Sequence, residues 1–359
     1  MTTLKIDTPT TIRHGEEIDL VKLNDFIQSQ VPDFEAITEI SQFSGGYSNL
    51  TYFLKTANNE YVLRRPPVGA KDIKGGHDMS REFKILSAVK SVGYEKVPNP
   101  IIFTEDAWVM GCPFYIMERV QGIILRAEDA PKLVASVAPE EMRKLSESLC
   151  DNLADLHAID IETTGLINIG KPEGYIRRQV EGWHKRYLAS QTDEILAMDN
   201  LANWLKTNLP TETKPTLIHN DYKYDNVVLN DQNLSQIVAV LDWEMTTVGD
   251  PMMDLGTTLS YWAEANDGAF EKNFNLSWVA GNLTRQEFAD RYAQKSGRDV
   301  SNILYFYVFG LFKNSVVIQQ IYNRYKKGLT TDPRFANLIV GVKALSKKGV
   351  LSVEKGRMV

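Results

Sequence analysis

The spacing of hydrophobic and polar positions changes along the chain, and this change predicts two parts of different structure. From Ile37 to Glu118, short β-branched and aromatic runs are separated by glycine, asparagine and proline, which favours strands joined by tight turns. The expected strands are 37–43, 50–56, 61–64, 101–104 and 114–118. One helix is predicted among them at 81–90, because Phe83, Leu86 and Val89 fall on one helical face.

Outside this region the pattern predicts mostly helix. A short amphipathic helix is expected first, at 18–30, and longer ones follow at 142–157 and 174–188. Residues 302–325 carry apolar and aromatic side chains on nearly every helical face, so this helix should be buried. Thr284 with Glu287 is a capping-box signature that predicts a further helix start. The chain is therefore expected to form an α+β fold.

One stretch departs from both patterns and carries candidate chemistry. An apolar pair, 217–218, leads into a polar loop with Asp221 and Asn226, and two β-branched runs follow, the second ending on Asp242. Such a strand–loop–strand unit places three oxygen-bearing side chains together at one end of the strands. In phosphoryl transfer a protein mainly positions the acceptor hydroxyl and a Mg²⁺ ion. Asp221 is the candidate base, and Asn226 and Asp242 are the candidate Mg²⁺ ligands.

The spacing from His219 to Asn226 matches the His-x-Asp-x-x-x-x-Asn loop of protein kinases, with Asp242 at the position of their metal-binding aspartate. The sequences of the two motifs, His-Asn-Asp and Asp-Trp-Glu, resemble those of the aminoglycoside phosphotransferase family of small-molecule kinases. Within it, the chain is most similar to the branch related to kinase-like domains fused to acyl-CoA dehydrogenases. The resemblance implies a two-lobe kinase-like fold, with a small antiparallel N-lobe at 1–117 and a mostly helical C-lobe at 118–359. It also implies ATP and Mg²⁺ as cofactors.

The same resemblance suggests nucleotide-binding residues before and at the hinge between the lobes. A glycine turn is the candidate phosphate lid, although a plain hairpin is the alternative reading: Ser44, Gly45, Gly46, Tyr47 and Ser48. It is not a Walker A loop, because no Gly-Lys-Ser/Thr follows. Arg64 stands where kinases carry lysine, and Glu82 is its expected ion-pair partner. Glu118 and Val120 occupy hinge positions, where backbone groups bind adenine.

The acceptor is expected to be a small molecule. Only about seven residues separate Asp242 from Asp250, which leaves no room for the activation segment that binds a peptide substrate. Lys223 matches a kinase lysine that contacts the γ-phosphate, and a solvated loop lysine is the equal alternative. Asp250 and Asp254 are expected to support the loop, and His157 to make structural hydrogen bonds. Residues Trp183, His184 and Arg186 either line an acceptor pocket or belong to the core.

Composition narrows the remaining classes of function. With 40 basic and 46 acidic residues the net charge is -6 and no basic stripe occurs, so nucleic acid is not an expected partner. Two cysteines cannot build a disulfide framework, and the apolar run 303–312 is too short to span a membrane. The N-terminus lacks a secretory signal, so a cytoplasmic protein is expected. The pattern does not predict the oligomeric state.

Two readings of function stay open from the residues alone. The first is transfer of phosphate from ATP to a small hydroxylated metabolite, for which the branch resemblance favours a hydroxyacyl or other lipid-derived acceptor. The near-absence of an acidic cluster before the last helices disfavours a polycationic aminoglycoside. The second reading is a pseudokinase or nucleotide-binding scaffold. Arg64 in place of lysine favours the scaffold, whereas intact Asp221, Asn226 and Asp242 oppose it.

Overall fold

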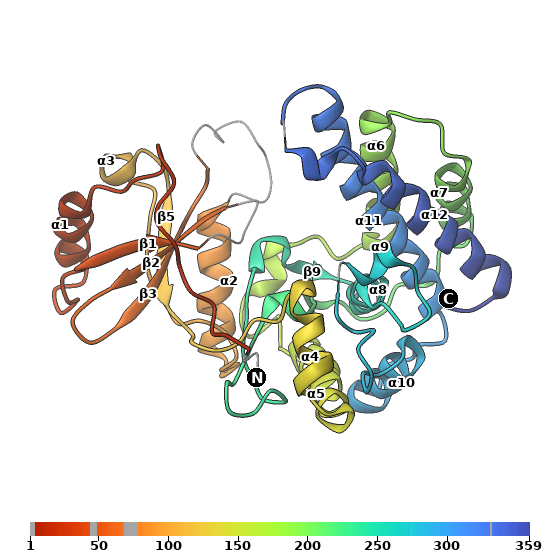
Figure 1. The fold of residues 1–359 in the computed structure, drawn as a ribbon, viewed down its shortest axis with the longest axis horizontal. Helices are drawn as coiled ribbons and strands as arrows, with labels where there is room; N and C mark the ends of the chain where they lie inside the picture. The colour runs from red at the N-terminus through yellow and green to blue at the C-terminus, as the bar shows by residue number, and fades with distance from the viewer. Residues whose placement is uncertain (1–3, 44–48, 68–77, 274, 331) are drawn as a thin grey trace.

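The computed structural model describes residues 4–43, 49–67, 78–273, 275–330 and 332–359. A sheet with three helices forms one end of the molecule, and the remaining helices form the other end (Figure 1). Within the described ranges, no helix combines the length and the apolar character that crossing a membrane requires. The α+β class expected from the hydrophobic pattern is confirmed.

The described residues of the N-terminal region form an antiparallel sheet of five strands in the order β1-β2-β3-β5-β4. The strands are β1 (Glu39–Gln42), β2 (Leu50–Lys55), β3 (Glu60–Arg65), β4 (Pro100–Thr104) and β5 (Phe114–Glu118). Each matches a strand predicted from the sequence to within a few residues. In the register, Arg64 of β3 lies opposite Thr51 of β2 and Tyr115 of β5. This pairing fixes Arg64 in the middle of the sheet.

The two-residue period of a strand sends neighbouring side chains of β3 to opposite faces of the sheet. Leu63 packs on one face in a cluster that includes residues of α1 (Leu20–Gln30) and α3 (Ala107–Met110). Val62 packs on the other face, in a core that includes α2 (Met79–Ser91) and continues into the helical part. Arg64 shares the face of Val62, and its side chain therefore points towards α2 and the helices.

The helical part is built around α11 (Ile303–Lys326), which packs against α6, α7, α8 and α12. Its helices are α4 (Ala130–Ser136), α5 (Pro139–His157), α6 (Tyr175–Ser190), α7 (Leu196–Thr207), α8 (Pro251–Tyr261), α9 (Ala269–Lys272), α10 (Arg285–Ser296), α11 and α12 (Leu338–Lys355). The predicted capping box is present, because Thr284 and Glu287 bond each other at the start of α10. The prediction that α11 is buried is also confirmed.

Two short antiparallel strand pairs, of which the second is a hairpin, hold the stretch that carries the candidate chemistry. Strand β6 (Thr216–Ile218) pairs with β9 (Thr247–Gly249), and β7 (Val227–Leu229) pairs with β8 (Ile237–Val240). The loop after β6 and the segment after β8 therefore lie next to each other. The sequence predicted the second hairpin, but it did not predict β9.

A close approach of two glycines sets the spacing between α8 and α11. A Cβ at Gly256 would lie 2.3 Å from the backbone of Phe306, and one at Gly310 would lie 2.6 Å from the carbonyl oxygen of Gly256. Real side chains cannot occupy such positions, so any larger residue would force the helices apart. Since α8 carries Asp254 and α11 carries Lys313, this contact also fixes two side chains of the site described below.

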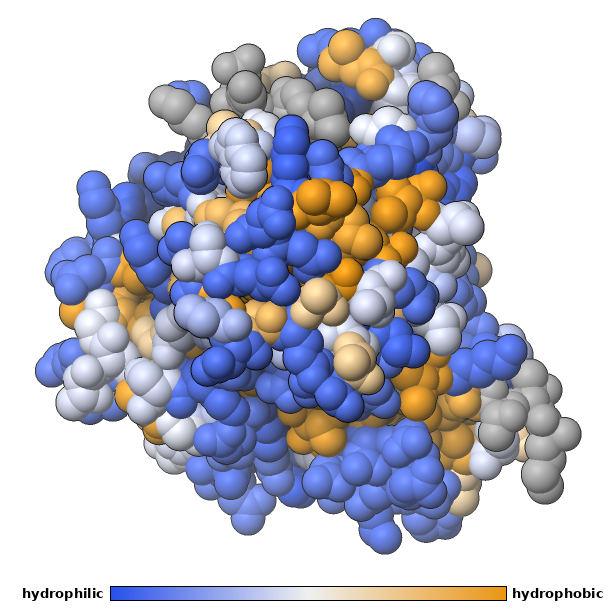
Figure 2. All heavy atoms as spheres, turned by 90° about the vertical axis from the view of Figure 1, so that its left-hand side faces the viewer, coloured by the Kyte–Doolittle hydropathy of each residue, from blue (hydrophilic) through white to orange (hydrophobic). Residues whose placement is uncertain are grey.

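The sheet end of the molecule exposes some apolar side chains, and Figure 2 shows them among hydrophilic ones. Val21 of α1 and Trp108 of α3 are 70% and 58% exposed, respectively. Leu23 and Ile27 of α1 are fully buried, so the helix keeps one face in the core and turns Val21 to solvent. Single exposed apolar residues of this kind are common on folded proteins.

Candidate active site

The loop after β6 is anchored by one buried carboxylate. Asp254 of α8 has no exposed surface and accepts hydrogen bonds from the backbone amides of His219, at 2.6 Å, and Asn220, at 2.7 Å. His157 Nε2 lies 3.1 Å from the same carboxylate, and its Nδ1 lies 2.6 Å from the Tyr292 hydroxyl. The predicted supporting roles of Asp254 and His157 are confirmed. Asp250 instead caps α8 and accepts from the amides of Met252 and Thr213.

His219 connects this loop to the segment that carries Asp242. Its Nδ1 accepts from the Asp221 amide at 3.3 Å, so the proton must sit on Nε2, which donates to the Leu241 carbonyl at 2.9 Å. The histidine of the motif is therefore a structural bridge between the end of β6 and the end of β8. Through this bond, His219 holds Leu241, the residue before Asp242, against the loop that carries Asp221.

Asp221 is held as an oriented, ionised carboxylate. Asn226 Nδ2 donates to its Oδ2 at 2.9 Å, and Lys223 Nζ lies 3.1 Å from the same oxygen. Burial opposes ionisation here, but the charges of Lys223 and Lys313 outweigh burial and hold the Asp221 pKa below its ordinary value. A carboxylate in this state can accept a proton from a hydroxyl group placed beside it.

Lys223 is paired, so the reading of a solvated loop lysine is wrong. Its ammonium lies between Asp221 and Asp225, at 3.1 and 3.7 Å, and 4.9 Å from the centre of the Tyr261 ring. Burial disfavours its charge, but Asp221 and its other neighbours raise the Lys223 pKa above the ordinary lysine value. Lys223 therefore stays charged next to the candidate base.

Asn226 and Asp242 lie on neighbouring strand ends. The Leu241 amide donates to the Asn226 carbonyl at 2.8 Å, which brings Asp242 next to Asn226. The Asn226 side-chain NH₂ is occupied by Asp221, so Oδ1 is the atom of this side chain that is suited to binding a metal. Asp242 adopts a left-handed backbone, with φ of 65°, and Asn220 does the same with φ of 67°. These are unusual conformations for residues other than glycine.

Arg64 joins the sheet to this segment. Its guanidinium lies 2.5 Å from Glu82 Oε1, 3.2 Å from Asp242 Oδ1 and 3.6 Å from Glu244 Oε2. The ion pair predicted between Arg64 and Glu82 is present. Glu244 also accepts from Asn49 at 2.9 Å, so its side chain points inward. Burial raises the Glu82 pKa, although Arg64 opposes the change.

The donor set around Arg64 fits a magnesium ion. Asp242 and Glu244 direct carboxylate oxygens at one cationic group, which shows that negative charge converges at this point. In the described parts of the chain, His, Cys, Asp and Glu form no group of three or more that could hold a metal by itself. Mg²⁺ is commonly bound through one or two carboxylates together with substrate phosphates. The described residues are therefore suited to a metal that arrives with a nucleotide.

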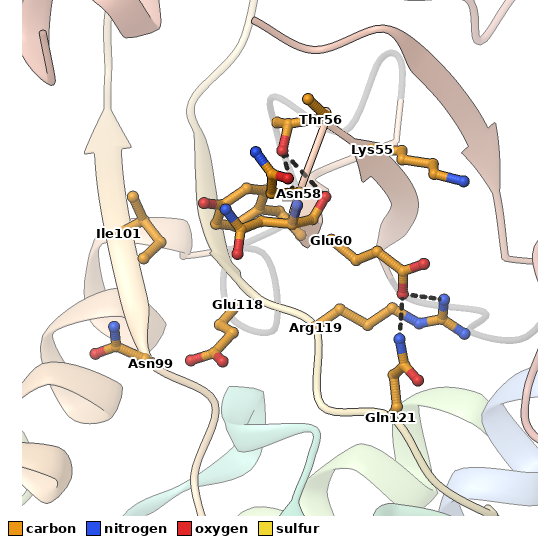
Figure 3. Close-up of a pocket in the computed structure, with 12 residues that line it drawn as sticks. Lys55, Thr56, Asn58, Glu60, Asn99, Ile101, Glu118, Arg119 and Gln121 are labelled. Atoms are coloured by element: carbon orange, nitrogen blue, oxygen red, sulfur yellow. Dashed lines mark hydrogen bonds and ion pairs between the residues drawn. The ribbon is translucent and has the colours of Figure 1, made fainter. Parts of the chain in front are cut away.

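A hollow of about 440 Å³ lies beside the hinge (Figure 3). Glu118 lines it together with residues of the β2–β3 turn, and Glu60 bonds Arg119 and Gln121 at its edge. None of its lining residues belongs to the loop of Asp221 or to the segment after Asp242. We therefore do not assign it to the acceptor. The nucleotide contacts expected of Glu118 and Val120 stay a prediction, and the turn at 44–48 lies outside the described residues.

A second hollow, of about 290 Å³, adjoins the candidate base. Asn220, the residue before Asp221, lines it together with side chains of α6, α8 and α11. Trp183 and Arg186 of α6 both line it, whereas His184 does not. Trp183 is also 6% exposed, so it serves the core and the pocket together. The sequence analysis missed Lys313 at this site, although a lysine inside the apolar pattern of a buried helix was the available signal.

Comparisons with known proteins identify the family of this chain. Residues 39–288 match the sequence pattern of the phosphotransferase enzyme family. Acyl-CoA dehydrogenase family member 11 of Rattus norvegicus is 34% identical over 320 residues, which cover 87% of this chain and 40% of that protein. The chain thus spans well under half the length of this relative. This match confirms the predicted resemblance to the branch related to kinase-like domains fused to acyl-CoA dehydrogenases.

Solved structures give the same result for the fold. A candidate aminoglycoside phosphotransferase from Ralstonia eutropha is 27% identical, covers 94% of this chain and 99% of its own, and superposes with a TM-score of 0.81. The structure of APH(2″)-IIIa with GDP and kanamycin is 18% identical, covers 92% of this chain and 99% of its own, and gives a TM-score of 0.61. At that identity the likeness concerns the fold alone.

Proposed function

This chain belongs to the phosphotransferase enzyme family, and we propose that it transfers the γ-phosphate of ATP to a hydroxyl group of a small molecule. The observation that carries the proposal is the position of Asp221. Its carboxylate is ionised, fixed by Asn226 and Lys223, and next in sequence to Asn220, which lines a pocket of small-molecule size.

In the proposed reaction, the acceptor oxygen forms a bond to the γ-phosphorus while the bond between that phosphorus and ADP breaks. The hydroxyl proton goes to Asp221, which orients the acceptor beforehand. Asn226 and Asp242 would hold Mg²⁺, which supplies positive charge to the phosphate oxygens. Lys223 is assigned to the transferred phosphate, since it keeps its charge beside the base.

Arg64 and Glu82 are assigned to the α- and β-phosphates. Glu82 restrains the guanidinium from one side, and the planar fork leaves donors for phosphate oxygens on the other. Those donors lie against Asp242 and Glu244 in the described structure. The backbone of Glu118 and Val120, at the proposed boundary between residues 1–117 and 118–359, is assigned to the adenine ring, and the turn at 44–48 to the phosphates.

The test is the substitution Asp221→Asn, which keeps the size of the side chain but removes the base. We expect turnover to fall at least about a hundredfold, the ordinary contribution of a general base, while Mg·ATP affinity stays close to that of the wild type. Turnover is measured as ADP release from Mg·ATP, or as GDP release from Mg·GTP as a second donor, with a panel of hydroxylated acceptors. Asp231→Asn, in the exposed turn of the same hairpin, is the matched control.

Two results would contradict the proposal in different ways. Wild-type turnover by Asp221→Asn would place the base elsewhere. Binding of Mg·ATP without turnover on any acceptor would favour the scaffold that the arginine at position 64 suggested.

A further inference from the structure

The pocket beside Asn220 carries an unusual concentration of positive charge. Four of the residues that line it are cationic, and none is Asp or Glu: Lys171, Arg178, Arg186 and Lys313. Across the described ranges of the chain, none of these four forms an ion pair with a carboxylate. Lys313 is buried and the other three are exposed, and Arg178 donates to the backbone carbonyls of Lys171 and Glu173. Because no carboxylate lines the pocket itself, its positive charge favours an anionic ligand.

Lys313 is the most informative of the four. It is 5% exposed, and its Nζ donates to the Asn220 carbonyl at 2.7 Å. An ammonium has three donors, so this bond leaves two for a bound group. Burial lowers the Lys313 pKa to about 8; the nearby carboxylates of Asp221 and Asp254 oppose this change, and the positive charges of Lys223 and Arg186 add to it. A buried lysine that is costly to keep charged gains from an anion placed beside it.

Arg186 brings a second cation to the same point. Its guanidinium lies 4.5 Å from the centre of the Trp183 ring, and Lys313 Nζ lies 5.9 Å from it. The two cations thus meet around one indole although they come from helices far apart in the sequence. The charge of Arg186 lowers the Lys313 pKa, and a negative group beside the two cations would relieve this repulsion.

Much of the remaining wall of the pocket is apolar or aromatic, with Gln179, Asn220 and Thr247 as its polar members. Tyr175, Met245, Met253 and Phe309 line it together with the cations. A ligand that satisfies both walls needs a charged group and a short hydrocarbon part. A pocket of about 290 Å³ suits a compact molecule of this kind.

We propose that the acceptor is a small organic anion, whose hydroxyl group lies at Asp221 and whose carboxylate or phosphate group lies against Lys313 and Arg186. This inference rests on the proposed function and names the class of substrate for that site. A polycationic acceptor would be repelled by the same side chains, so the pocket selects against it as well as for an anion. The Lys313 bond to the Asn220 carbonyl ties the anion-binding group directly to the loop that carries the base.

The experiment measures binding with Mg·ADP present, by calorimetry, so that no turnover is needed. The probes are 3-hydroxybutyrate and its neutral counterpart 1,3-butanediol, glycerol 3-phosphate and its neutral counterpart glycerol, and choline as the cation. We expect at least one anion to bind about tenfold or more tightly than its neutral counterpart, because hydrogen bonds to charged groups contribute that much. The carboxylate and phosphate arms identify which anionic group the pocket takes.

Variants connect the binding to the two named cations. Arg186→Gln, at an exposed position, should weaken the anion about tenfold, and Lys313→Met should weaken it further. Arg177→Gln is the matched control, because Arg177 is exposed on the same helix but does not line the pocket. It should bind the anion as the wild type does.

The inference is overturned if no anion binds, if 1,3-butanediol, glycerol or choline binds as tightly, or if Arg186→Gln and Lys313→Met bind the anion normally. Turnover on the same probes is measured separately. An anion that binds through Arg186 but accepts no phosphate supports the anion site and counts against phosphotransfer alone.

Discussion

Removing Arg64 should damage the protein more than removing its partner Glu82. Glu82 is 2% exposed, and Arg64 is the cation that opposes the effect of burial on it. Arg64 contacts Asp242 and Glu244 as well, so it keeps two carboxylates when Glu82 is gone. The two single substitutions therefore leave very different charges behind: Arg64→Ala strands a buried carboxylate, whereas Glu82→Ala leaves a paired guanidinium.

The magnitudes follow from this asymmetry. Breaking a buried pair by removing one partner costs about 3–5 kcal/mol, and we expect this loss of unfolding free energy for Arg64→Ala. For Glu82→Ala we expect about 1.5–3 kcal/mol, the ordinary contribution of one hydrogen bond to a charged group. The double variant leaves no stranded carboxylate, so it should be less destabilised than the sum of the singles, by roughly 1–3 kcal/mol.

Urea denaturation of the nucleotide-free protein measures these differences, and the same variants are titrated with Mg·ATP. Nucleotide affinity should fall more for Arg64→Ala than for Glu82→Ala, because Glu82 acts through Arg64. Arg65→Ala is the control: Arg65 is also buried and occupies the next position of β3, but it bonds the Tyr52 hydroxyl and the Glu16 carbonyl on the opposite face. It should lose stability and keep its nucleotide affinity. Strict additivity, or a larger loss for Glu82→Ala, would refute the reasoning.

Two further predictions concern the carboxylates of the site. If Asn226 and Asp242 bind Mg²⁺, ATP should raise the melting temperature mainly when the metal is present. Asp242→Asn should remove most of this metal-dependent increase. Equal increases with and without Mg²⁺ would exclude Asn226 and Asp242 as the metal ligands. Asp254→Asn should lose about 2–4 kcal/mol at neutral pH, because its NH₂ would face the backbone N–H donors of the loop. Hydrogen bonds and nearby charges overcome burial and lower the Asp254 pKa in the folded state, so its contribution is present above about pH 4 and is lost as the pH falls through that lowered pKa. The stability gap between wild type and Asp254→Asn should therefore narrow in acid, and a gap that widened would contradict this assignment.

Much of the fold could be predicted because its signals are local. The alternation in β2, β3 and β5 and the helical spacing in α2 and α5 each depend on a few neighbouring residues. The same holds for the loop from His219 to Asn226, whose members lie within eight positions of one another. A short loop between paired strands brings such residues together whatever the rest of the chain does.

What could not be predicted depends on distant partners. The three hydrogen bonds of Asp254 come from residues about 34 to 97 positions away, and no local pattern encodes them. The pocket joins Arg186 and Lys313 from separate helices, so its charge becomes visible only when the helices are packed. The orientation of the Glu244 side chain could not be predicted from the sequence either, because it is set by Asn49, just before β2, and by Arg64 of β3.

The left-handed backbones of Asn220 and Asp242 set a limit on how durable this protein can become. Each non-glycine residue in that conformation costs about 1–2 kcal/mol, and both adjoin the groups to which the chemistry is assigned. A screen that selects only for heat resistance would reward glycine at Asn220, where the strain would relax and the bond of its side chain to Met245 would be lost. Such a screen would make the fold more stable, but it would remove a hydrogen bond between two residues that line the proposed acceptor pocket. Resistance to heat and catalytic output are therefore opposed at this position, and attempts to strengthen the protein should begin elsewhere.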